Sequence, residues 1–408
     1  MLDIGHPARW LTVRRIRMHG FVLAVCLWTA YAAILATPGM KDHSGLIKGT
    51  DFLHFYTLGT LANEGRGDLL YDIPGQEKVV ARVLPEAAGY RYVPLYGPQV
   101  SLLFAPVARL PYGWALTVWL ALNAAIYAAC CYVIWKTCSS LQDQGWTAVI
   151  LAAAFPGIFH LLLWGQTSGL ALACFTLGYL ALRTQHDFLA GLAIGSLIFK
   201  PQLGLAAAVV FVLAGQWKVV AGAVTAMAAQ LAAGWGHYGN AVMRDYANAL
   251  LHVQNMLPWL EPRPYQMHSL RSFWSLIVPW PEASFVLYLI SALAALALLV
   301  LAWRRGLPLE LRFSALLFST VLVSPHLTAY DLVILAPAFL LLVDWSRSPS
   351  AGETAGRVQL LLYLSYPLFL LGPVVRYIHV QLSVVAMFAL LWFIVRSGVR
   401  PKRPFAAG

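Results

Sequence analysis

Apolar stretches long enough to cross a lipid bilayer recur along this chain from Met18 almost to its C-terminal end. The hydrocarbon core of a bilayer is roughly 30 Å thick, and about 20 apolar residues in a helix span it. Hydrophobic residues make up 60% of the 408 residues and charged residues only 11%, which excludes an ordinary soluble domain. Lipid offers no hydrogen-bond partners to the backbone, so such segments must be helical. The sequence predicts an all-α, polytopic integral membrane protein.

The excess of basic residues indicates how the chain is oriented in the membrane, and it does not indicate nucleic-acid binding. The net charge is +11, but Arg14, Arg15, Arg17 and Arg304 lie at the ends of apolar runs. This placement is typical of cytoplasmic anchors. No basic stripe with interleaved aromatic residues lies outside the apolar runs, so we expect no nucleic-acid partner. No His, Cys, Asp or Glu cluster has metal-like spacing, and we expect neither a metal nor a cofactor.

The apolar runs divide the chain into about twelve predicted spans within a single transmembrane domain, 1–408. Basic residues at both ends of the chain, including Arg9, Arg400, Lys402 and Arg403, place both termini in the cytoplasm of a multi-pass protein of the cell (inner) membrane. Two large extracytoplasmic loops then cover 37–111 and 234–282. The short apolar run 100–107 is predicted to be re-entrant or interfacial. The predicted spans are 18–36, 112–135, 146–163, 167–182, 188–199, 203–213, 219–233, 285–303, 307–323, 329–343, 358–371 and 378–395.

This topology gathers the unusual polar residues at the outer ends of helices or in outer loops. Polar and ionisable groups close to lipid are costly, so their convergence on one face predicts a functional site. The candidates are Asp51, Gln166, Lys200, His268, Arg271 and His326.

Each candidate also has a purely structural explanation. Asp51 fits the N-cap of an interfacial helix, and Gln166 beside Gly165 fits a turn between two helices. Lys200 precedes a helix-breaking proline, where its amine could instead extend to the membrane interface. The other three have similar alternatives: a capping or core position for His326, and a solvated loop position for His268 and Arg271.

One carboxylate with several cations at an outer membrane face suits glycosyl transfer from a lipid phosphate. The leaving phosphate is already a stable anion, so the reaction chiefly needs a base for the acceptor hydroxyl and cations for the phosphate. Asp51 fits the base, while Lys200 and Arg271 fit the phosphate ligands. The side chains expected to orient the sugar, the phosphate or the acceptor are Gln166, His268 and His326.

Six segments carry a resemblance to a known family: "GTDFLHFY" in the first loop and "YRYVPLYGPQ" after it, then "LLLWGQTSGL", "IFKPQLG", "MHSLRSFW" and "VSPHLTAYD". In this order they resemble glycosyltransferase family 87, which belongs to the C-type glycosyltransferase superfamily. The resemblance implies a multi-spanning, inverting transferase with a large first extracytoplasmic loop. It also implies a polyprenyl-phosphate sugar donor and a catalytic aspartate in the first loop, which is Asp51 here.

Other family motifs fall on Gly165 and Gln166, on Lys200 with Pro201, and on Ser324, Pro325 and His326. The chain departs from the family pattern in two places. It has Met267 and His268 where many members have Asn and Gln, and Val93 within a Tyr-Pro-Pro motif.

We therefore expect a membrane hexosyltransferase that moves a hexose, with mannose as the expected sugar, from a polyprenyl-phosphate donor to a glycan or lipid-linked acceptor. The main alternative is a transporter or flippase for a lipid-linked sugar. Such proteins often contain internal repeats and polar groups at the bilayer midplane. This sequence has no evident repeat, and its polar residues gather at one end of the predicted spans. A scaffold without chemistry would leave that cluster unexplained.

Overall fold

A computed structural model describes residues 11–253, 263–352 and 354–397. Helices and short 3-10 turns form these ranges, which contain no β-strand. The predicted anchors Arg9, Arg400, Lys402 and Arg403 lie outside the described residues, as does 254–262 of the second loop. The α-helices are α1 (Val13–Leu35), α2 (Thr50–Asn63), α3 (Ile73–Val83), α4 (Gln99–Phe104), α5 (Tyr112–Thr137), α6 (Gly145–Ala153), α7 (Pro156–Trp164), α8 (Ser168–Arg183), α9 (Asp187–Gly195), α10 (Pro201–Leu213), α11 (Trp217–Leu251), α13 (Leu270–Ile277), α14 (Pro281–Arg304), α15 (Leu309–Val323), α16 (Ala336–Ser346), α17 (Thr354–Leu368), α18 (Gly372–Ile378) and α19 (Leu382–Ser397).

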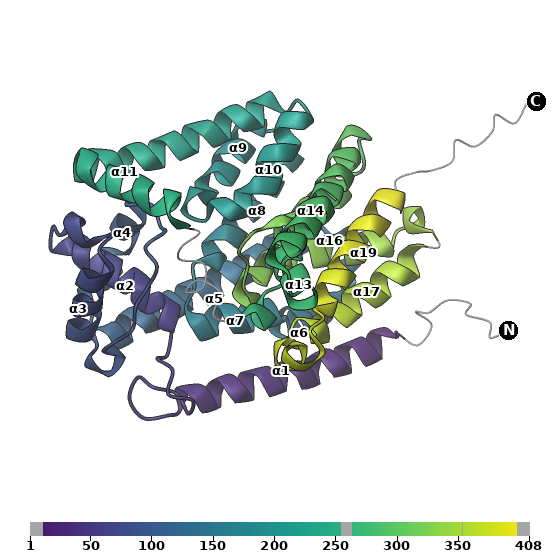
Figure 1. The fold of residues 1–408 in the computed structure, drawn as a ribbon. Helices are drawn as coiled ribbons and strands as arrows, with labels where there is room; N and C mark the ends of the chain where they lie inside the picture. The colour runs from purple at the N-terminus through teal and green to yellow at the C-terminus, as the bar shows by residue number, and fades with distance from the viewer. Residues whose placement is uncertain (1–10, 254–262, 353, 398–408) are drawn as a thin grey trace, which may run out of the picture.

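The fold is organised around α15, in which every residue from Phe313 to Val323 is buried. Helices α10, α14, α16 and α19 pack around it. Helix α1 runs along the outside of the molecule, and α2, α3 and α4 gather at the end opposite α17 and α19 (Figure 1). The helices of the first loop thus form a separate group at one end of the bundle.

The outer helices expose large apolar side chains, which identifies their outward surfaces as lipid-facing. A soluble protein rarely exposes apolar patches of this extent. Because lipid replaces water around these helices, the exposed apolar side chains do not destabilise the protein. Examples from α1, α5 and α14 are Met18, Phe21, Val22, Leu122, Phe285, Ile290 and Leu293.

Within the described ranges, five helical segments are long and apolar enough to cross a membrane, and bent pairs raise the number to seven. One bent pair joins 139–153 to α7 at 43°, and the other joins α17 to α18 at 89°. Helices α8, α10 and α19 have 16, 13 and 16 residues. At 1.5 Å per residue they rise about 20–24 Å, less than the apolar core of a bilayer. The twelve predicted spans are therefore not confirmed.

The apolar run 100–107 forms α4 and part of a 3-10 turn, η3 (Val107–Arg109), and both pack on α2. Helix α2 begins after Gly49, whose φ of 63° lies in the left-handed region that favours glycine. Most of α2 is buried, from Phe52 to Gly59 and again at Leu61. The first loop therefore presents a packed helix, and not a flexible tether, to the rest of the protein.

Small residues allow α9 and α11 to pack backbone against backbone. A Cβ atom at Gly191 would meet Val219 O, and one at Gly195 would meet Ala223 O. In return, a Cβ at Gly222 of α11 would meet Phe188 O. Glycines four residues apart on a membrane helix commonly permit this close approach.

We predict that Gly195→Leu separates α9 from α11 and destabilises the protein by about 1–3 kcal/mol, the usual cost of overpacking. The measurement is the thermal unfolding midpoint in detergent. Gly204→Leu is the matched control, because a Cβ at this helical glycine of α10 has nothing within 4 Å. Equal unfolding midpoints for the two variants would contradict the close packing.

Candidate functional site

Asp51 lies in the first turn of α2, and its carboxylate Oδ2 accepts a hydrogen bond from Gln166 Nε2 at 3.0 Å. The N-cap of the helix is Gly49, so the alternative that Asp51 caps α2 is wrong. A negative charge in the first turn is favoured by the helix dipole. The side chain is partly buried, unlike Phe52 to Phe55, which are fully buried.

The orientation of the Gln166 amide is fixed by its neighbour. Its Oε1 accepts hydrogen bonds from Thr167 N at 2.8 Å and from Thr167 Oγ1 at 3.0 Å. Because both donors require an oxygen, the amide nitrogen must face Asp51. Gly165 makes this turn possible with a φ of 67°, ending α7 immediately before Gln166. The turn between α7 and α8 therefore aims one donor at the Asp51 carboxylate.

Lys200 lies next to α10 and pairs with a carboxylate that the sequence analysis did not select. Its Nζ is 2.8 Å from Asp331 Oδ1 and 3.0 Å from Ser168 Oγ. The side chains of Lys200 and Asp331 are 3% and 1% exposed, so the lysine does not reach the membrane interface. A buried lysine without this partner would be an uncompensated charge.

Asp331 belongs to the 3-10 segment η7 (Ala329–Leu335), whose N-cap is Thr328. The sequence held a signal for it, because Asp331 is the one carboxylate near the start of the predicted span 329–343. An ionisable residue inside an apolar run needs a partner of opposite charge, and Lys200 was the obvious candidate. Sequence reasoning sought an anionic ligand for Lys200 and overlooked the anion within the chain.

Tyr92, Tyr96 and Tyr330 interact electrostatically with the Asp51 carboxylate. The Lys200 ammonium lies 4.8 Å from the centre of the Tyr330 ring, a cation–π distance. Tyr92 donates to Thr50 O at 2.7 Å and stacks on His54 with ring centres 4.8 Å apart. Burial lowers the pKa of His54 to about 3, so this imidazole is neutral at physiological pH.

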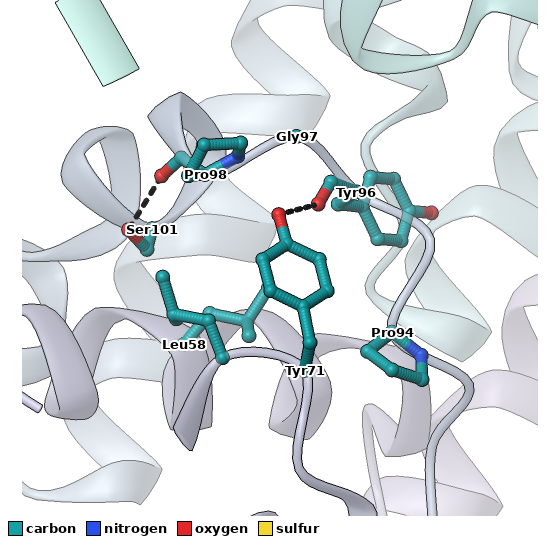
Figure 2. Close-up of a pocket in the computed structure, with 8 residues that line it drawn as sticks. Leu58, Tyr71, Pro94, Tyr96, Gly97, Pro98 and Ser101 are labelled. Carbon is teal, nitrogen blue, oxygen red and sulfur yellow. Dashed lines mark hydrogen bonds between the residues drawn. The ribbon is translucent and has the colours of Figure 1, made fainter. Parts of the chain in front are cut away.

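Tyr96 reaches the same network from the segment before α4. Tyr71 donates to Tyr96 O at 2.9 Å across a small cavity of about 10 Å³, enough for about one water molecule (Figure 2). The Tyr96 ring points away from Tyr71 (Figure 2), and its hydroxyl lies 3.4 Å from Gln166 Oε1. Tyr71 thus anchors the backbone at Tyr96, while the Tyr96 hydroxyl faces Gln166.

Burial raises the pKa of Asp51 to about 6. The Gln166 amide, the Lys200 charge and the Tyr330 hydroxyl oppose that rise, while the negative charge of Asp331 adds to it. Desolvation outweighs the favourable partners. The result is a carboxylate that is mostly ionised at pH 7 and more basic than an ordinary aspartate, as a general base requires.

Arg271 and His326 lie on two segments that are joined by an antiparallel backbone bridge between Met267 and Thr328. The Arg271 guanidinium donates to Pro325 O at 2.9 Å, immediately before His326. The carbonyl of His326 accepts from Ser324 Oγ at 2.8 Å. His326 does not open a helix, because Thr328 is the N-cap of η7.

His268 is buried at 1% exposure, so the alternative of a solvated loop position is wrong. Its Nδ1 lies 2.7 Å from Ser383 Oγ, and its ring meets Phe369 edge-on. Burial, with a smaller contribution from His160, lowers the pKa of His268 to about 3. No hydrogen bond described for His268 joins it to Asp51, Gln166 or Lys200.

A cavity of about 220 Å³ is lined by Gly49 and Thr50, where α2 begins. Apolar side chains of α1, α5 and α7 form much of its wall, and polar side chains of the first and second loops also contribute. The apolar contributors include Ile34, Leu116 and Leu162, and the polar ones include Asp42, Lys48 and Arg263.

The family model described as "Glycosyltransferase family 87" matches residues 95–325, more than half of the chain. The match includes Gln166, Lys200 and Arg271 and begins after Asp51. No curated protein and no solved structure matches the chain.

We predict that Gly165→Ala disturbs the turn that positions Gln166. An added Cβ would lie 2.8 Å from Phe52 Cβ, in addition to the strain of a left-handed alanine. Strain of this kind costs about 1–3 kcal/mol, so the unfolding midpoint in detergent should fall. Gly306→Ala is the control, because Gly306 has a φ of 63° with nothing within 4 Å. If both variants lose the same stability, the contact with Phe52 has no role.

Proposed function

The chain belongs to glycosyltransferase family 87, and we propose that it transfers a hexose, with mannose as the first candidate, from a polyprenyl-phosphate donor. The acceptor would be a glycan or a glycolipid, and the reaction would take place at the extracytoplasmic face of the cell membrane. Both termini would then be cytoplasmic. Family membership favours a transferase over the transporter and scaffold alternatives.

The proposed reaction is a single displacement with inversion at the anomeric carbon. The Asp51 carboxylate takes the proton of the acceptor hydroxyl while that oxygen forms a bond to the anomeric carbon. The bond from the anomeric carbon to the phosphate oxygen breaks, and its electron pair stays on the polyprenyl phosphate. One base and stabilisation of the leaving anion are sufficient for this chemistry.

The observation that carries the proposal is the environment of Asp51. The carboxylate is partly exposed, one of its oxygens is held by Gln166, and its raised pKa of about 6 lies close to physiological pH. A general base is most effective when its pKa lies near the working pH. The second carboxylate oxygen would accept the acceptor hydroxyl.

The charges around Asp51 indicate that more than one cation is needed. Asp51 and Asp331 carry two negative charges when ionised, and Lys200 supplies one positive charge, which leaves the group negative. A phosphate diester would bring a further negative charge into a partly dry site. We propose that Lys200 binds the phosphate on the side of Asp51 and that Arg271 supplies the second positive charge.

The remaining candidates would orient the substrates. Gln166 uses its amide on Asp51 and Thr167, so we propose that it positions the base and, through it, the acceptor. His326 adjoins the contact between Arg271 and Pro325 and would orient the phosphate or the sugar. His268, which contacts Ser383, would act by supporting the segment that carries Arg271.

The cavity beside Gly49 supports a lipid-linked substrate. Its wall combines leucines of membrane-spanning α5 with polar residues of the loops, so it offers contacts to a hydrocarbon chain and to a polar head group. Gly49 and Thr50 line this cavity and immediately precede Asp51.

We predict that Asp51→Asn lowers the rate of transfer by about 10²–10⁴-fold, because the amide cannot take up the proton. Donor binding should persist, because asparagine is isosteric and its oxygen can still accept from Gln166. The assay measures release of polyprenyl phosphate from purified protein supplied with polyprenyl-phosphate mannose and extracted membrane glycolipid.

Asp68→Asn is the control for this variant. Asp68 also lies in the first loop, but it is exposed and pairs with Arg66 at 2.8 Å. Its substitution should leave transfer unchanged. Transfer by Asp51→Asn at the wild-type rate would rule out the base role of this residue.

The pH dependence follows from the raised pKa of Asp51. Only the ionised carboxylate accepts a proton, so kcat/KM should be constant above about pH 6 and fall below it. The decline should approach about tenfold per pH unit for a single essential base. An ordinary aspartate would instead keep its activity down to about pH 4. A flat profile between pH 7.5 and 5 would contradict the assignment.

A further inference from the structure

The buried ion pair of Lys200 is part of a closed ring of three side chains. Ser168 begins α8, Lys200 immediately precedes α10, and Asp331 belongs to η7, so three distant segments meet at one point. Ser168 Oγ lies 2.6 Å from Asp331 Oδ1, and Lys200 Nζ lies within 3.0 Å of both partners. The exposed fractions are 0% for Ser168, 3% for Lys200 and 1% for Asp331.

The proton positions in this ring can be assigned from its donors and acceptors. An ionised carboxylate only accepts, so the Ser168 hydroxyl donates to Asp331. The serine oxygen then accepts from Lys200, which donates its second N–H to Asp331. Asp331 Oδ2 accepts from Thr328 N at 3.4 Å. Two of the three ammonium N–H groups of Lys200 donate to these partners, and the two hydrogen bonds fix the position of the ammonium.

That fixed position is beside the proposed base. Tyr330 lies between the two, because its ring faces the Lys200 ammonium at 4.8 Å and its hydroxyl stabilises the Asp51 carboxylate. Asp51 is faced by titratable, charged or polar side chains from every neighbouring segment. They are Tyr92 and Tyr96 from the segment before α4, Tyr112 from α5, Gln166 from the turn before α8, Lys200, and Tyr330 and Asp331 from η7.

Lys200 and Asp331 are the members of this group that form an ion pair. They act on Asp51 in opposite directions, because the ammonium favours the carboxylate and the second carboxylate opposes it. Their separation from each other is fixed at 2.8 Å by the ring. The net effect of these two charges on Asp51 therefore depends on where the ring holds the ammonium.

We propose that Asp331 and Ser168 are positioning residues, which hold the Lys200 ammonium on themselves and keep it from pairing with Asp51, so that Asp51 remains available as a base. This inference rests on the proposed base role of Asp51 and adds two residues to the site. Asp331 does not touch the substrates in this scheme, and it acts through Lys200.

The test measures the protonation of Asp51 directly and needs neither donor nor acceptor. Dicyclohexylcarbodiimide is an apolar reagent that reacts with protonated carboxyl groups, and Asp51 is partly exposed whereas Asp331 is not. The full-length protein in detergent is treated over a pH series, and labelling of the peptide that contains Asp51 is quantified by mass spectrometry. The midpoint of labelling reports the pH at which Asp51 ionises.

Two variants should move this midpoint in opposite directions. Asp331→Asn removes one negative charge and leaves Lys200 with Asp51 as its remaining anion, so the midpoint should fall by about one pH unit. Lys200→Gln removes the favourable ammonium, so the midpoint should rise by about one pH unit. The acid limb of the transfer rate should shift in the same directions.

Controls keep the result interpretable. Asp344→Asn should not move the midpoint, because Asp344 accepts from Ser140 N at 2.7 Å and lies in α16, away from the ring. A double variant, Lys200→Gln with Asp331→Asn, removes the pair together and avoids an uncompensated buried charge. Its midpoint should lie between those of the two single variants, and its transfer rate should fall at least tenfold.

An unchanged midpoint in Asp331→Asn, or a double variant with the wild-type transfer rate, would overturn the proposal. Shifted midpoints combined with full transfer by Asp51→Asn would instead leave the ring intact and refute the proposed function. The two failures are therefore distinguishable.

Discussion

The contact on which the site depends is the buried ion pair between Lys200 and Asp331. Removing two charges from water costs several kcal/mol for each ion, and only close geometry with further hydrogen bonds offsets that cost. Ser168 supplies such a bond. Because each member comes from a different segment, the pair fixes the start of α8, the start of α10 and η7 relative to one another. The turn that carries Gln166 immediately precedes α8, so the same contact also supports the donor to Asp51.

The glycines provide the space that this arrangement needs. Gly49 and Gly165 adopt left-handed conformations at the two turns that bring Asp51 and Gln166 together. A Cβ at Gly165 would approach Phe52 Cβ and Gly49 Cα, so the two turns touch directly. Polar atoms at the site are thus positioned by close backbone packing, and the surrounding aromatic residues fill the remaining volume.

The membrane class and the helical fold could be predicted from the sequence, because apolar periodicity and length are local properties. The helix that carries Asp51 was also anticipated, but its N-cap was not, since a left-handed glycine leaves no side-chain signal. The number of spans could not be counted reliably. Apolar runs such as those of α8 and α10 look like spans in the sequence, and their actual lengths fall short of a bilayer. Among the candidate site residues, Gln166 and Lys200 stand out in the sequence as polar residues in apolar runs, whereas the pairing of Asp331 with Lys200 does not, because the two residues lie far apart in the chain.

The backbone bridge between Met267 and Thr328 has a consequence for how such a chain can vary in length. The bridge fixes the segment before α13 against the segment before η7. The guanidinium of Arg271 therefore meets Pro325 only at the present spacing. One residue inserted between Met267 and Arg271 would rotate the arginine by about 100° around α13. The stretch from Met267 to Arg271 therefore tolerates substitution more readily than a change of length.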